Sequence, residues 1–165
     1  MTQEEVLVAG KKVWGTVIRG TATALGIIGG IIAIYSFLQT YSRYDLTGQW
    51  NLNNTIQTTS DSKYKGLKLG YRIFLTQSET NLTGTGEKWY ENGKTIPPSA
   101  HTHISLTGSI SGSKVTATME EEGTERKTEG TLEWTYNPKT KTLTGTFTST
   151  AADTSGPSSA ELSPQ

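Results

Sequence analysis

The chain has 165 residues, enough for one ordinary domain and some appended sequence. Its 15 basic and 15 acidic residues balance, which argues against a nucleic-acid-binding protein that works by bulk positive charge. The absence of cysteine excludes disulfides, a thiolate nucleophile and cysteine-ligated zinc.

An uncharged apolar segment, GTATALGIIGGIIAIYSFL, occupies residues 20–38. An α-helix rises about 1.5 Å per residue, so this segment is long enough to cross a hydrocarbon core of ~30 Å. We therefore expect one transmembrane helix, at about residues 17–40, inside an N-terminal segment that covers residues 1–44. The alternatives are a cleaved signal peptide, whose apolar core is usually shorter, and a buried core helix, which usually carries a polar stripe.

Small residues recur at every fourth position of this segment, at Ala22, Gly26 and Gly30. Small side chains on one helix face let two helices approach closely in lipid, where van der Waals packing drives association. The pattern predicts a homo-oligomer formed through the membrane. The alternative is chance, because glycine is common in transmembrane helices.

After residue 44 the hydrophobic pattern changes to a period of two, which is typical of strands with one buried face. The clearest run is Leu67, Leu69, Tyr71, Ile73 and Leu75. Seven or eight such runs, separated by turn formers, predict an all-β domain over residues 45–152. We expect a small antiparallel up-and-down barrel of about eight strands, with a two-sheet sandwich as the alternative. Residues 153–165 are rich in Ser, Pro and Ala and are expected to be disordered.

The tripeptide Leu-Thr-Gly recurs four times, beginning at Leu46, Leu82, Leu106 and Leu143. We interpret it as a recurring strand device. The leucine packs inside, and the glycine lets the strand bend or a neighbouring strand approach at a barrel corner.

Two of these segments resemble the strands of calycin barrels, the lipocalins and avidins. Leu46-Thr47-Gly48-Gln49-Trp50 is similar to their Gly-x-Trp opening strand, and Leu143-Thr144-Gly145-Thr146-Phe147 is similar to their Leu-Thr-Gly-aromatic strands. The resemblance covers about residues 45–152 and implies a barrel architecture. It implies no particular ligand.

The order of the predicted parts is similar to that of a second group, the transmembrane β-barrel effectors of bacterial cyclic-oligonucleotide antiphage systems (CBASS). In that family the barrel binds a cyclic nucleotide, and the membrane part then oligomerises and disrupts the inner membrane. The resemblance implies an antiviral-defence effector with a small anionic ligand, such as a cyclic di- or trinucleotide. The family commonly has two spans, whereas this chain shows one.

Strand phase predicts which polar side chains share the barrel interior. Arg126 has the parity of Trp134 and Tyr136, and Lys88 has that of Tyr90. Aromatic rings stack on bases and guanidinium groups bind phosphate, so the set suits a nucleotide. The candidate ligand-binding residues are Trp50, Tyr71, Lys88, Tyr90, Arg126, Trp134 and Tyr136. A buried cation needs a glutamate partner, solvent at a strand end or an anionic ligand. The alternative to a ligand site is a packed core whose cations lie at the barrel rims.

No motif indicates catalysis, metal binding or a cofactor, so we expect a protein that is not an enzyme. His101 and His103 form a His-x-His pair without a third ligand and are expected to be solvated. The run Glu120-Glu121-Glu122 is most simply a solvated turn.

The charges around the apolar segment place Lys11, Lys12 and Arg19 before it and Arg43 after it. By the positive-inside rule this small bias puts the barrel outside the cell membrane. A sensor of a cytosolic nucleotide needs the opposite orientation, and we expect a single-pass inner-membrane protein with a cytosolic barrel. The first functional hypothesis is a ligand-sensing effector. The second is a membrane-tethered calycin-like carrier or scaffold for a lipid, peptide or protein.

Overall fold

The computed structural model describes residues 44–123 and 127–164. The predicted transmembrane helix, with Ala22, Gly26 and Gly30, lies outside these residues. Within them, no helix is both long enough and apolar enough to cross a membrane.

Nine strands and three short 3₁₀ helices make up the described part of the chain. The strands are β1 (Gly48–Thr55), β2 (Lys68–Ser78), β3 (Asn81–Glu91), β4 (Lys94–Thr95), β5 (Thr102–Ser111), β6 (Lys114–Glu122), β7 (Lys127–Asn137), β8 (Thr142–Ser149) and β9 (Thr154–Leu162). The 3₁₀ helices are η1 (Ser62–Tyr64), η2 (Pro98–Ala100) and η3 (Ala151–Asp153).

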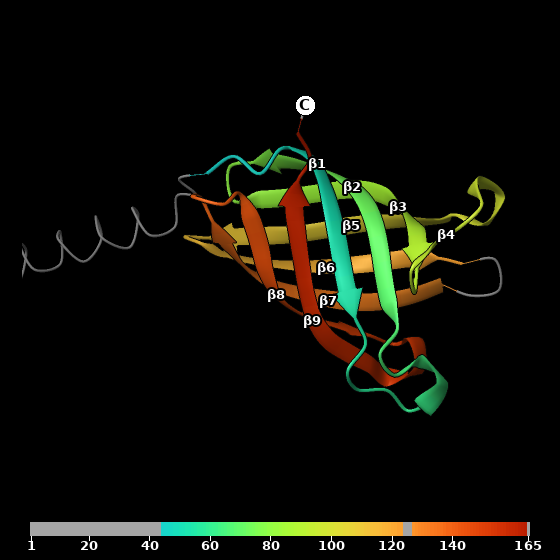
Figure 1. Ribbon diagram of the computed structural model, residues 1–165. Helices are drawn as coiled ribbons and strands as arrows, with labels where there is room; N and C mark the ends of the chain where they lie inside the picture. The colour runs from blue at the N-terminus through green and yellow to red at the C-terminus, as the bar shows by residue number, and fades with distance from the viewer. Residues whose placement is uncertain (1–43, 124–126, 165) are drawn as a thin grey trace, which may run out of the picture. The chain divides into compact units, whose positions relative to one another are not determined.

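Eight of the strands close into an antiparallel up-and-down barrel (Figure 1). Each long strand pairs with the next along the chain, and β1 pairs with both β2 and β9. The two-residue strand β4 forms a side hairpin on β3. The predicted barrel is confirmed, and closure of one sheet through β1 and β9 excludes the sandwich.

The prediction of a disordered tail is wrong. Residues 154–162 form β9, which pairs with β8 on one side and with β1 on the other. Its inward residues are small, with Ser158 and Ala160 both buried. A strand of Ser, Gly, Pro and Ala carries almost no hydrophobic signal, yet the barrel cannot close without it because β1 and β8 would otherwise be exposed edges.

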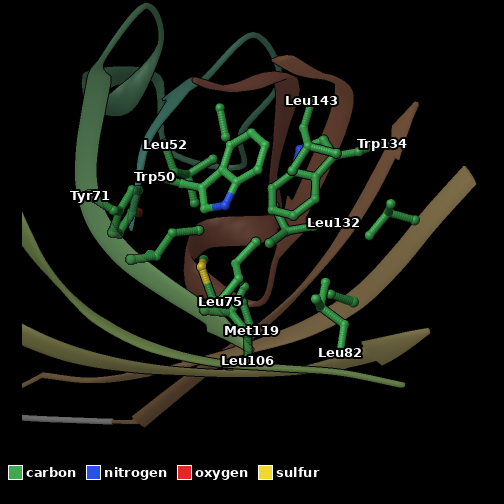
Figure 2. Packing of buried hydrophobic residues seen from close by; sticks show 14 of the residues in the cluster. Trp50, Leu52, Tyr71, Leu75, Leu82, Leu106, Met119, Leu132, Trp134 and Leu143 are labelled. Atoms are coloured by element: carbon green, nitrogen blue, oxygen red, sulfur yellow. The ribbon is translucent and has the colours of Figure 1, made fainter. Parts of the chain in front are cut away.

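The alternating apolar residues fill the barrel interior, as the period of two predicts. Figure 2 shows Trp50 and Trp134 pointing into the barrel among leucines from several strands. All four leucines of the Leu-Thr-Gly segments are buried. At Gly145 a β-carbon would overlap the carbonyl oxygen of Glu133 on the neighbouring strand, and at Gly108 it would overlap that of Thr116. Close approach of strands therefore explains two of the repeated glycines.

Candidate functional site

One end of the barrel is plugged by side chains. The indole N–H of Trp50 donates to the carbonyl oxygen of Leu46 at 2.9 Å. Tyr136 packs against Tyr44, with ring centroids 5.0 Å apart, and against the edge of Trp50 at 6.3 Å. The first described residues of the chain thus lie at a filled end, where β1 begins.

The other end, where β1 ends, holds a pocket of about 410 Å³. Its apolar wall comes from strands and from the β1–β2 loop: Ile56, Tyr64, Leu67, Leu69, Met119 and Phe147. Its polar wall consists of Lys88, Glu91, Thr102, Glu121, Thr128, Ser149 and Thr154. A pocket of this size with apolar walls and a few polar groups has the usual properties of a small-molecule site.

An ion pair lies in the polar wall. The Lys88 ammonium is 2.7 Å from a carboxylate oxygen of Glu121 and 3.9 Å from one of Glu91. The Lys88 and Glu121 side chains are only 18% and 16% exposed. The pairing satisfies the requirement that a largely buried charge has a partner.

Tyr71 connects this ion pair to the barrel interior. Its hydroxyl donates to the other Glu121 oxygen at 3.5 Å, a long hydrogen bond. Burial, and secondarily the Glu121 charge, raise the pKa of Tyr71 well above its ordinary value. The amide of Asn54 acts on this pKa in the opposite direction, although neither polar atom of that amide makes a hydrogen bond of standard geometry.

Two loops frame the pocket and are joined to each other. The Ser60 N–H donates to the carbonyl oxygen of Ala152 at 2.8 Å, and the Thr59 hydroxyl donates to the same oxygen at 3.1 Å. Ala152 and Asp153 are consecutive left-handed residues, with φ of 52° and 47°. Non-glycine residues rarely adopt this conformation, so the β8–β9 turn holds local strain beside the pocket.

The structure separates the predicted ligand-binding residues. Tyr71 and Lys88 line the pocket. Trp50 and Trp134 are buried core residues, and the indole N–H of Trp134 donates to the hydroxyl of Ser158 at 2.8 Å. Tyr136 packs at the plugged end. Arg126 lies outside the described residues. The inward orientation of both tryptophans is confirmed, but neither they nor Tyr136 line the pocket with Tyr71 and Lys88.

Tyr90 also lies away from the interior, because a β-bulge reverses the strand phase. Lys88 is opposite Tyr71, but Tyr90 is opposite Gly70, so Trp89 is an extra residue in β3. Gly70 lies against the Tyr90 ring. The Arg72 guanidinium stacks over the Trp89 ring at 4.1 Å. Parity from Leu82 to Tyr90 could not reveal an inserted residue, and the predicted position of Tyr90 is wrong.

Glu121 is the principal pocket residue that the sequence did not single out. It was expected in a solvated acidic turn, but β6 extends to Glu122 and Glu121 faces the pocket. The signal was present, since Glu121 shares the parity of Val115, Ala117 and Met119. Of the alternatives for an inward cation, pairing with a glutamate is the one observed for Lys88.

His101 and His103 do not share a site. His101 lies before β5, with Nδ1 2.8 Å from Glu87 and Nε2 2.9 Å from the carbonyl oxygen of Ile96. Its hydrogen bond with Glu87 is the main reason that the pKa of His101 is raised. No group of three or more side chains that could hold a metal ion occurs in residues 44–123 and 127–164.

No protein-family model matches the sequence, and no curated protein matches it either. The fold and the pocket therefore carry the functional argument. A closed antiparallel barrel of eight strands is consistent with the calycin-like fold that the sequence resembles. Such barrels hold one small ligand when side chains do not fill the whole interior.

Proposed function

We propose that the chain is a membrane-tethered binding protein whose barrel takes up a small organic ligand at its open end. The observation that carries the proposal is the pocket of about 410 Å³. Side chains fill the rest of the barrel. The volume of this pocket is within the range of small-molecule sites, and its lining combines apolar and polar groups. The tether is the uncharged segment at residues 20–38.

A pair of tryptophan variants tests ligand uptake. Thr128 and Thr131 are both half-buried on β7, but only Thr128 lines the pocket. The full chain is placed in phosphatidylcholine nanodiscs, and binding of the neutral probe 1-naphthalenemethanol is measured by equilibrium dialysis against empty nanodiscs. We expect saturable binding that Thr128→Trp weakens at least about tenfold, because the indole fills the pocket, and that Thr131→Trp leaves unchanged. Binding that is equal in both variants, or never saturates, contradicts the proposal.

A narrower proposal concerns the consequence of binding. The resemblance to antiphage effectors suggests that ligand, in that family a cyclic nucleotide, promotes association of the membrane helices and damages the bilayer. Such coupling requires that ligand bind the oligomer better than the monomer. Cyclic di- and trinucleotides should then shift the oligomer distribution of the full chain, and activation should impair growth. An unchanged distribution and normal growth would leave the carrier or scaffold as the better account.

A further inference from the structure

The charges in the pocket wall are unequal. Among the described lining residues, Glu91 and Glu121 are the acids and Lys88 is the base. Lys88 contacts both carboxylates, at 2.7 Å and 3.9 Å, so one negative charge is left over among these described residues. An anionic ligand that enters the pocket meets Lys88, whose ammonium is already paired with two carboxylates.

The negative charge is felt inside the pocket. Glu121 is largely buried, and its second oxygen is 3.5 Å from the Tyr71 hydroxyl. After burial itself, the charge of Glu121, its hydrogen bond with the Tyr71 hydroxyl and the charge of Glu91 raise the pKa of Tyr71. Electrostatic interactions with a partly desolvated ligand are stronger than the same interactions in bulk water.

The rest of the lining is mainly apolar, with the hydroxyl groups of Thr102, Thr128, Ser149 and Thr154 spread among the apolar side chains. The apolar side chains include Ile56, Leu67, Met119 and Phe147, and they offer no hydrogen-bonding groups to a ligand. An apolar body with one polar head therefore suits a ligand that contacts both the apolar side chains and the ion pair. The head meets carboxylate oxygens, which accept hydrogen bonds and attract positive charge.

We infer that the pocket selects ligands with an apolar body and a cationic, hydrogen-bond-donating head, such as a primary amine, over ligands with an anionic head. The inference rests on the proposed binding function and names the ligand class for the same pocket. This class differs from the anionic ligand that the resemblance implies, so one titration decides between them.

Three naphthalene probes that differ in their heads test the charge preference. They are 1-naphthylmethylamine, 1-naphthalenemethanol and 1-naphthoate, titrated into the full chain in phosphatidylcholine nanodiscs at pH 7.5, with empty nanodiscs subtracted. We expect the amine to bind roughly fivefold or more tightly than the alcohol, and the carboxylate to bind most weakly.

Two variants with the same change of charge locate the effect. Glu121→Gln removes the excess negative charge and leaves Lys88 with Glu91 alone, so it should abolish the amine preference and improve binding of 1-naphthoate. Glu120→Gln is the matched control, because Glu120 lies next to it on the outer face, paired with Lys127 at 2.5 Å. It should leave the order of the probes unchanged.

The outcomes separate the two proposals. Equal binding of the three probes, tightest binding of 1-naphthoate, or equal effects of the two glutamine variants overturns the charge inference and leaves the binding function standing. No saturable binding of any probe overturns the binding function itself.

Discussion

Asn54 lies on β1 between the core residue Leu52 and the pocket residue Ile56. The residue is 1% exposed, and neither its amide nitrogen nor its amide oxygen makes a hydrogen bond of standard geometry, although the amide acts on the pKa of Tyr71. Such a group costs about 1–3 kcal/mol, because it loses water without replacement.

Replacing this amide by a hydrocarbon of similar size should stabilise the protein. We expect Asn54→Leu to raise the free energy of unfolding of the full chain by about 1 kcal/mol, because the desolvation cost disappears. Denaturant titration in a mild detergent measures the change. The control is Asn53→Leu, the exposed neighbour on the outer face, which should stay within about 0.5 kcal/mol of wild type. A clear loss of stability in Asn54→Leu would contradict this prediction and would mean that the interaction of the amide with Tyr71 outweighs its desolvation cost.

At the scale of elements, a continuous row of outward threonines crosses the sheet. The row is Thr76, Thr83, Thr107, Thr118, Thr131 and Thr148, each paired with the next across β2, β3, β5, β6, β7 and β8. Threonine combines high strand propensity with a polar surface, and cross-strand threonine pairs are favourable. The row explains why Thr follows Leu in the repeated tripeptide at Leu82 and Leu106: leucine faces inward and threonine outward.

The segment between β3 and β5 is held by a histidine that responds to pH. Both ring nitrogens of His101 face acceptors, Glu87 and the carbonyl oxygen of Ile96. Only the protonated ring can donate to both. The charge of Arg72 opposes protonation, but the hydrogen bond with Glu87 prevails, so the pKa of His101 is raised in the folded protein.

A raised folded-state pKa sets the sign of the pH dependence. The stabilisation is fully present below the unfolded pKa of about 6.5 and is lost as pH rises through the folded value. We therefore expect the stability difference between wild type and His101→Gln to be largest near pH 5.5 and to shrink at alkaline pH. Denaturant titrations across this range measure it. In a Glu87→Gln background the dependence should shrink to the smaller contribution of the Ile96 carbonyl, and an undiminished dependence there would contradict the assignment.

At the scale of the molecule, the alternation of apolar and polar residues predicted those features that depend on the sequence of each strand alone. It predicted the closed barrel, the inward leucines and Tyr71 and Lys88 in the interior. It failed where the determining interaction is not local. The strand β9 has too little hydrophobic signal to be recognised alone. The bulge at Trp89 depends on pairing with β2, and Glu121 was hidden by its acidic neighbours. An inward aromatic side chain packs in the core or lines the pocket according to its position along the barrel axis. Strand phase alone does not give that position.

The proposed function requires that ligand enters the open end of the barrel and occupies the pocket there, without displacing the core residues. The chain contains no cysteine, so a single introduced thiol reports one position. Thr128→Cys places the thiol in the pocket wall and Thr131→Cys places it on the outer face of the same strand. The rate of maleimide labelling is measured on the full chain in nanodiscs, with and without saturating 1-naphthalenemethanol. We predict that the probe slows labelling of Thr128→Cys at least about fivefold, by direct cover of the thiol, and leaves Thr131→Cys unaffected. Equal rates with and without probe in both variants would contradict the central claim.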